Sequence, residues 1–237
     1  MKVFVPLVLT LALLASSCLG QQVLFSDDFT TGMDDAWTNP DGGWVAEDGH
    51  LTVTSACGFQ SCNPNIYAGG SEQANYLISF DFMVTEAFTY HGSGVGFYVA
   101  LSDPNEPDEG AVSGYSIGFG WSSDGQPANA NCEIWRMDGA SNSQIAYNTG
   151  ESFWIEPHTP YHVVLGRVGS TLVIKKWADG EAEPTWLMSI DDTTYSAGYW
   201  MPIWWNNVGW IDNVVVTGIG VVSNEDLTWG GVKSMYR

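Results

Sequence analysis

The sequence predicts an all-β protein, an antiparallel jelly-roll β-sandwich. Short stretches of alternating apolar and polar residues recur along most of the 237-residue chain, and a period of two is the pattern of a half-buried strand. Clusters of Asp, Asn, Gly and Pro separate these stretches, as expected of turns between strands. No pattern of strands alternating with long helices is present, which argues against a parallel sheet.

The predicted strands follow one another closely along the chain. The clearest stretches lie within 50–56, 75–84, 94–103, 114–121, 132–137, 143–148, 161–180 and 210–218. The stretch 161–180 predicts two strands around a turn at Gly169–Ser170. The most evident long loop is "SDPNEPDEGAVSG" at 102–114.

The ends of the chain differ from this pattern. Residues 1–20 predict a secretory signal, because one positive residue precedes an apolar run that is too short to span a membrane. Cleavage after Gly20 leaves a soluble chain; alternatively "LASSC" resembles a bacterial lipobox, with Cys18 as a lipid anchor. One domain is then expected at 21–220, followed by a tail or short C-terminal helix at 221–237. The tail also resembles tryptophan-containing C-terminal tails of exported bacterial proteins, which implies a sorting or attachment tag.

The formal net charge of −20 restricts the partners. An acidic surface repels phosphate backbones and anionic polymers, which argues against nucleic acid. Neutral ligands and divalent cations remain compatible, and the alternative is that the acidity only maintains solubility.

The cysteines permit one internal disulfide. Export allows disulfides, and Cys57 and Cys62 are close enough in sequence to bridge a loop or a hairpin end. Cys132 is then left over, and the sequence does not fix the pairing.

Four segments carry a resemblance to a known family. They are the opening "LFSDDFTTGMDDAWTNPDGGWVAEDGHLTV", the middle "GYSIGFGW", the hairpin "VVLGRVGSTLVIKKWADG" and the closing "GYWMPIWWNNVGWIDNVVVTG". In this order they resemble the concanavalin A-like lectin/glucanase superfamily in its laminin-G-like bacterial form. The resemblance implies an antiparallel sandwich, often sugar-binding, whose first and last strands lie close together.

The same resemblance implies a structural calcium ion near the two ends of the domain. Asp27, Asp28 and Asp212 are the matching candidates, since carboxylates suit a hard cation. The alternative is that Asp212 accepts backbone hydrogen bonds and caps a turn without a metal.

Catalysis is not predicted by any motif. The hydrolases of the superfamily carry two glutamates flanking an aspartate on one strand, E-x-D-x-(x)-E, and this chain lacks that triplet. Glu133 and Asp138 are five residues apart and face opposite ways on a regular strand. The match of "GYSIG" to G-x-S-x-G lies in an alternating stretch, not in the strand–turn–helix context that a nucleophile requires.

A binding site is predicted instead from aromatic and amide residues. Sugar rings stack on exposed aromatic faces, while acids and amides bind hydroxyl groups. The candidates are Tyr115, Trp121, Trp135, Trp205, Asn206 and Asn207. Trp204 and Trp205 are adjacent, so one should enter the core while the other faces outward.

The sequence therefore predicts an exported, non-catalytic, carbohydrate-binding sandwich, with neutral glycans as partners and calcium as a structural cofactor. Two alternatives stay open: a structural or attachment protein of a cell surface or matrix, and a divergent glycoside hydrolase. The sequence leaves the oligomeric state open.

Overall fold

The computed structural model describes residues 21–39, 43–53, 67–68, 75–87, 94–103, 112–120, 126–205 and 207–219. These residues form strands and two short 3-10 helices. The strands in the first half are β1 (Gln21–Asp27), β2 (Trp37–Thr38), β3 (Trp44–Glu47), β4 (His50–Val53), β5 (Tyr67–Ala68), β6 (Tyr76–Ala87), β7 (Gly94–Leu101) and β8 (Ser113–Gly120). Those in the second half are β9 (Asn131–Asp138), β10 (Ser141–Thr149), β11 (Tyr161–Val168), β12 (Thr171–Ala178), β13 (Met188–Asp191), β14 (Tyr199–Trp205) and β15 (Asn207–Ile219). The 3-10 helices are η1 (Pro127–Asn129) and η2 (Glu151–Phe153).

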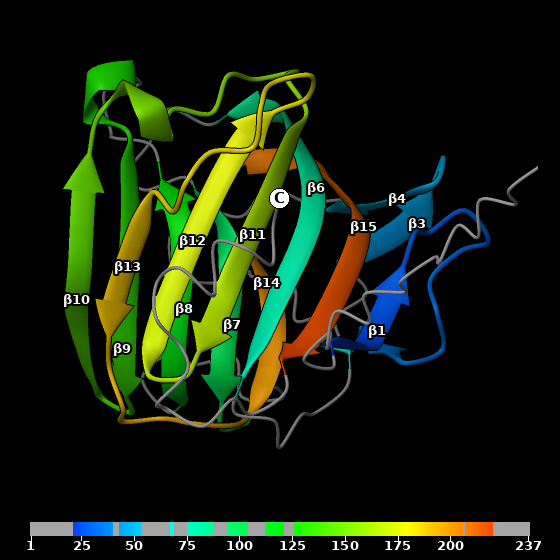
Figure 1. The fold of residues 1–237 in the computed structure, drawn as a ribbon. Helices are drawn as coiled ribbons and strands as arrows, with labels where there is room; N and C mark the ends of the chain where they lie inside the picture. The colour runs from blue at the N-terminus through cyan, green and yellow to red at the C-terminus, as the bar shows by residue number, and fades with distance from the viewer. Residues whose placement is uncertain are drawn as a thin grey trace, which may run out of the picture.

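Two antiparallel sheets pack face to face (Figure 1), and β2 and β5 pair in a separate two-stranded sheet. The eight-stranded sheet has the order β13-β12-β11-β6-β15-β4-β3, with β1 also paired to β15. The five-stranded sheet has the order β10-β9-β8-β7-β14. The predicted antiparallel jelly-roll sandwich is therefore confirmed.

The first and last strands of the described chain are neighbours, as the resemblance implied. β1 pairs antiparallel with β15 from Gln21 opposite Ile219 to Asp27 opposite Val214. The predicted hairpin is β11–β12, which turns at Gly169 with a φ of 64°. Glycine suits this turn because it adopts a left-handed conformation without steric strain.

Each strand buries alternate residues between the sheets. On β6, Ile78, Phe80 and Phe82 are at most 2% exposed. The inner face of a sheet is the side that carries such core residues, and the outer face is the opposite side. The predicted short C-terminal helix lies outside the described residues. No helix in the described ranges is long and apolar enough to cross a membrane.

Four of the described tryptophans are buried in the core. Trp37, Trp44, Trp200 and Trp204 are 2–7% exposed. The ring of Trp204 lies edge-on to those of Trp44 and Phe82. The prediction that one of the pair Trp204–Trp205 enters the core is confirmed for Trp204.

The core also contains one lysine. Lys176 points inward from β12, and its Nζ donates to the carbonyl oxygens of Ser152 at 3.1 Å and Trp154 at 2.8 Å. Its ammonium lies 4.8 Å from the ring centroid of Tyr161. Burial lowers the pKa of Lys176 to about 8. This contact fixes η2 and the residue after it to the eight-stranded sheet.

Polar residues cross the outer face of the eight-stranded sheet in one row, which we call the carboxylate row. The row consists of one residue from each of six neighbouring strands: Glu47, His50, Asp212, Asp81, His162 and Trp177. Strand pairing sets Glu47 opposite His50 and aligns Asp212, Asp81, His162 and Trp177. The two groups adjoin because β4 pairs with β15 at Leu51 and Thr52, next to His50. The Nδ2 of Asn213 donates to carboxylate oxygens of both Asp81 and Asp212. Burial and the nearby charges of Asp81 and Asp28 raise the pKa of Asp212.

Candidate functional site

The outer face of the five-stranded sheet carries polar and aromatic side chains at its β9–β10 edge. Glu133 and Trp135 alternate on β9 with Cys132 and Ile134, which are fully buried in the core. Strand pairing sets Gln144 opposite Trp135 and Tyr147 opposite Glu133. Directly paired residues share a face of the sheet, so these four lie together on the outer side. We call them the β9–β10 surface.

Within this surface a carboxylate and an amide lie between two aromatic rings. The Nε2 of Gln144 donates to Oε2 of Glu133 at 2.9 Å. These two residues occupy one diagonal of the four, so Trp135 and Tyr147 occupy the other diagonal. Tyr147 is 53% exposed and Trp135 is partly exposed. The arrangement offers hydrogen-bonding groups between two ring faces, which suits a ligand with hydroxyl groups and apolar edges.

One row of the sheet beside this surface consists of glycines. In the row of Glu133, the residues on β8 and β7 are Gly118 and Gly96. A Cβ added to Gly96 would lie 2.2 Å from the carbonyl oxygen of Ile117, and one added to Gly118 would lie 2.8 Å from that of Val95. Glycine is therefore required here because β7 and β8 approach each other closely.

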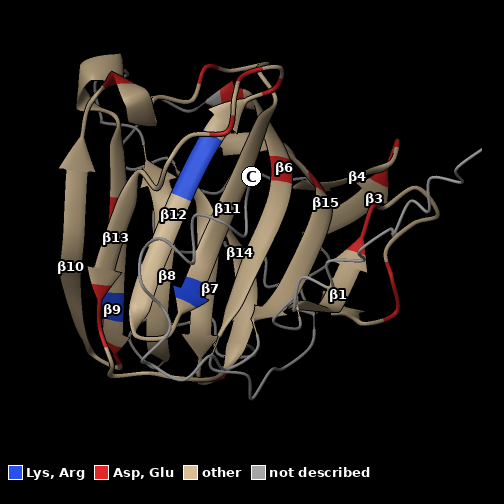
Figure 2. Cartoon of the chain, in the orientation of Figure 1, with Lys and Arg blue, Asp and Glu red and all other residues tan. Residues whose placement is uncertain are grey.

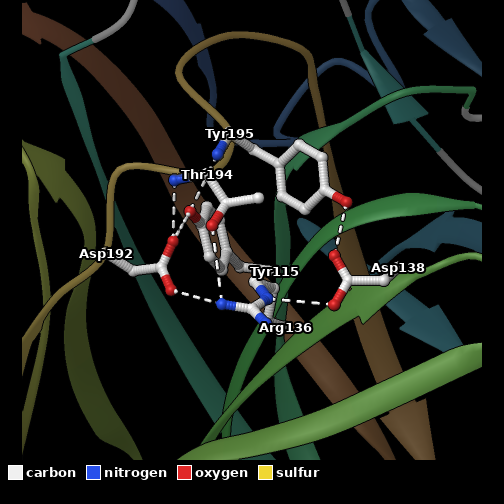
Figure 3. A network of polar contacts seen from close by, with 6 residues as sticks. All are labelled: Tyr115, Arg136, Asp138, Asp192, Thr194 and Tyr195. Atoms are coloured by element: carbon white, nitrogen blue, oxygen red, sulfur yellow. Dashed lines mark hydrogen bonds and ion pairs between the residues drawn. The ribbon is translucent and has the colours of Figure 1, made fainter.

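A polar network fixes β9 from its other side (Figure 3). Arg136, next to Trp135, donates from Nε to Asp138 and from Nη1 to Asp192, both at 3.0 Å. Asp192 also accepts the hydroxyl of Tyr115 at 2.7 Å. Asp192 follows the last residue of β13, so the network ties the end of the eight-stranded sheet to the middle of the five-stranded sheet.

The network serves structure and not proton transfer. Although burial opposes it, hydrogen bonds from Tyr115, Thr194 and Arg136 lower the pKa of Asp192 to about 2. Burial and the neighbouring Asp192 raise the pKa of Tyr115 to about 12. Neither group changes its protonation near neutral pH, so neither is poised for general acid–base catalysis.

The predicted ligand-binding residues are not all brought together. Trp135 lies on the β9–β10 surface. Tyr115 is fully buried, and Asn207 is 1% exposed with its Nδ2 donating to the carbonyl of Gly94, so neither offers a free face to a ligand. The backbone of Trp205 pairs with Gly94 at the far edge of the same sheet, but its side chain is outside the described part of the chain. Trp121 and Asn206 also lie outside the described residues.

The three predicted calcium ligands are engaged in hydrogen bonds. Asp27 accepts from the backbone N–H groups of Phe29 and Asp34 at 2.9 Å and from Trp37 Nε1 at 2.8 Å. Asp28 accepts from Thr30, and Asp212 accepts from the N–H of Asn213. Among the described residues, no group of three or more His, Cys, Asp or Glu side chains has the arrangement of a metal site. Calcium binding therefore stays a prediction.

The cysteine predictions concern mostly residues that are not described. Cys57, Cys62 and Cys18 lie outside the described ranges. Cys132 is a free, buried thiol, and burial raises its pKa. A buried thiol with a raised pKa is unreactive toward another chain.

Sequence reasoning missed Gln144 and Tyr147. These residues are three apart, so strict alternation would place them on opposite faces. The pairing of β10 with β9 shifts register between Gln144 and Ala146, and this bulge brings both side chains to the outer face. An aromatic residue, Tyr147, in an otherwise polar stretch was the available signal for a residue of the site. Nothing in the sequence located the bulge that brings it beside Glu133.

The fold is similar to that of solved β-sandwiches at low sequence identity. The VIP36 exoplasmic/lumenal domain, in a Ca2+/Man3GlcNAc-bound form, gives a TM-score of 0.60 at 12% identity over 83% of this chain and 91% of that one. The CBM2 module of the evolved Dit protein of Lactobacillus casei BL23 phage J-1 gives 0.58 at 11% identity over 85% and 97%. The xylan β-1,4-xylosidase of Bacillus halodurans C-125 gives 0.56 at 12% identity over 81% of this chain.

This likeness concerns the fold. The chain spans 38% of the Bacillus halodurans xylosidase and 39% of the GH43 protein BlXynB of Bacillus licheniformis. No protein-family model and no curated protein sequence match the chain. The comparisons therefore show a β-sandwich fold shared with the VIP36 domain, the CBM2 module and one part of two longer chains, a xylosidase and a GH43 protein.

Proposed function

We propose that the protein is an exported, non-catalytic β-sandwich of the concanavalin A-like class that binds neutral glycans through the β9–β10 surface. The observation that carries the proposal is the Glu133–Gln144 pair between the exposed rings of Trp135 and Tyr147. Sugar rings present apolar C–H faces to aromatic rings and hydroxyl groups to carboxylates and amides.

The charge of the protein favours a neutral ligand. With a net charge of −20, the surface repels sulfated and uronate polymers. Glu133 adds a negative charge at the site itself. A neutral glycan meets no such repulsion and can donate hydroxyl groups to the carboxylate.

Within the described residues, the β9–β10 surface carries one carboxylate, Glu133, and this favours binding over hydrolysis. Glycoside hydrolysis needs two carboxyl groups about 5–10 Å apart on either side of the scissile bond. Asp138, the other acid of β9, lies in the network behind the surface and is engaged by Arg136 and Tyr195. Within the four residues of the β9–β10 surface, Glu133 is the one acid.

The test is binding to a neutral-glycan array, followed by calorimetric titration of the best ligand. Trp135→Ala and Tyr147→Ala should each weaken binding about tenfold or more, a change of about 1.4 kcal/mol, with near-ultraviolet circular dichroism unchanged. Trp177→Ala, a partly exposed tryptophan on the other sheet, is the matched control and should leave affinity unchanged.

Other outcomes would favour the alternatives. No binding to any neutral glycan, together with self-association, would favour a structural or attachment protein. Release of reducing sugar that a Glu133→Gln variant abolishes would favour a hydrolase.

Export and calcium are separate parts of the proposal. The mass of the exported chain distinguishes cleavage after Gly20 from lipid attachment at Cys18. Calcium binding stays a prediction, and an unchanged melting temperature after chelation would contradict it.

A further inference from the structure

One end of the eight-stranded sheet is apolar on its outer face. The side chains there form a cluster separate from the central core, and we call it the outer apolar patch. It consists of Leu77, Val164, Val168, Val173 and Ile219. Their strand neighbours Ile78, Leu165 and Ile174 belong to the central core, which places the patch on the opposite, outer side.

This patch is buried although the outer face of an antiparallel sheet is normally solvated and polar. Leu77 and Val173 are 2% exposed, and Val164 is 6% exposed. Among the described apolar side chains outside the cluster, Trp177 and Trp186 pack against it, and both remain partly exposed. The adjoining carboxylate row has the expected polar character, so the apolar residues mark a place where something else packs.

The end of the described chain lies in the patch itself. Ile219 is the last residue of β15, and its N–H donates to the carbonyl of Asn75 at 3.0 Å. The 18 residues from 220 to 237 therefore start at the edge of the patch. Their length, about 27 Å as a helix and about 60 Å when extended, exceeds the width of four strands spaced about 4.8 Å apart.

The composition of this segment complements the sheet. It contains Leu227, Trp229, Val232 and Tyr236, which can cover an apolar surface. It also contains Lys233 and Arg237, two of the seven basic residues of the chain. The carboxylate row beside the patch offers acidic partners to these cations.

We propose that residues 220–237 fold back over the outer apolar patch, with Trp229, Val232 and Tyr236 against Leu77, Val164 and Val173. The basic residues at the end of the segment then lie near the carboxylate row. The segment thus becomes the occupant of the patch and closes the outer face of the sandwich. The glycan site on the other sheet plays no part in this contact.

Hydrogen exchange of the full exported chain, followed by mass spectrometry, tests the proposal. Amides between 226 and 236 should exchange at least tenfold more slowly than in a synthetic peptide of residues 220–237. The double substitution Trp229→Ala and Tyr236→Ala should remove this protection, and Asn224→Ala, in the polar part of the segment, should keep it.

Val173→Lys tests the same contact from the sheet and should also release the segment. Because the substituted tail residues belong to none of the described strands, the tail variants remain informative even if Val173→Lys unfolds. Exchange of residues 226–236 at the rate of the free peptide, in a chain with native near-ultraviolet circular dichroism, would overturn the proposal. Protection that disappears on dilution would also overturn it, because a second copy would then be the occupant.

Discussion

His162 joins three segments of the eight-stranded sheet through its two ring nitrogens. Nδ1 bonds to Asp81 on β6, and Nε2 lies 3.3 Å from Asp179, which follows β12. The ring also lies against that of Trp177, with centroids 5.4 Å apart. Partial burial alone would lower the pKa of His162, but the hydrogen bonds and charges of Asp81 and Asp179 outweigh it and raise the pKa. Asp212 and Asn213 face the same carboxylate from β15.

The raised pKa of His162 makes part of the stability pH-dependent. A group whose pKa is higher in the folded state than in the unfolded state stabilises the folded protein. This stabilisation is complete when the pH is below the unfolded-state pKa, about 6.5 for histidine. That contribution disappears as the pH rises through the folded value. His162→Gln should therefore lower the free energy of unfolding at pH 6 by about 1 kcal/mol or less, because the pair is partly exposed, and by less at pH 9. Urea unfolding at both values measures this, and an equal loss at both would contradict it.

At the scale of elements, the connection from β13 to β14 is held by side chains more than by sheet pairing. Asp192 and Tyr195 lie in this connection, and both bond to residues of the five-stranded sheet. The N–H of Tyr195 donates to the hydroxyl of Tyr115 at 3.0 Å, and its own hydroxyl donates to Asp138 at 2.6 Å. The connection thus fixes β8 and β9, and with them the β9–β10 surface.

Removing the charge of Asp192 should destabilise the sandwich at neutral pH. A carboxylate with a lowered pKa contributes stability above its unfolded value, about 3.9, and loses it as the pH falls through about 2. Asp192→Asn should cost about 1–3 kcal/mol at pH 7, the range for hydrogen bonds to charged groups, and much less at pH 2. Urea unfolding at the two values provides the comparison, with Asp191→Asn on the exposed neighbour as control. A loss at pH 2 as large as at pH 7 would contradict the role of the charge.

The alternation of apolar and polar residues predicted the strands, because a strand that buries one face between two sheets must alternate in this way. Trp37 and Trp44 are buried in the core because large apolar side chains at inward positions pack between the sheets. Trp186 instead borders the outer apolar patch, a position that alternation within one strand does not reveal. The site was less predictable, because the bulge in β10 and the burial of Tyr115 depend on which strands become neighbours. Sequence periodicity describes one strand at a time and does not tell which residues of neighbouring strands lie opposite each other.

At the scale of the molecule, the described sandwich buries most of its cationic side chains. Arg167, Lys175 and Lys176 are 4–7% exposed, and Arg136 lies between Asp138 and Asp192. Lys175 forms an ion pair with Glu183 and lies 4.5 Å from the ring centroid of Trp186. Figure 2 shows the same distribution, with blue restricted to β9, β11 and β12 and red spread over strands and loops. The outside of the described sandwich is therefore acidic apart from histidine and the partly exposed Arg136.

A surface of one charge destabilises the folded state by self-repulsion, and salt screens this repulsion. The screening length falls from about 30 Å at 0.01 M to about 3 Å at 1 M ionic strength. The melting temperature should therefore rise by several degrees between 0.02 M and 1 M sodium chloride. A melting temperature that falls over this range would show that the ion pairs outweigh the repulsion.

The burial of the cations also governs how proteases act on the protein. An enzyme that cleaves after lysine or arginine must bind that side chain in its own pocket. In the described sandwich such side chains are enclosed in strands or held between carboxylates, so cleavage there requires unfolding. Lys233 in the tail is a different case, since it belongs to no described strand. Limited digestion with trypsin should therefore cut after Lys233 before it cuts within the sandwich, and the sandwich should stay whole.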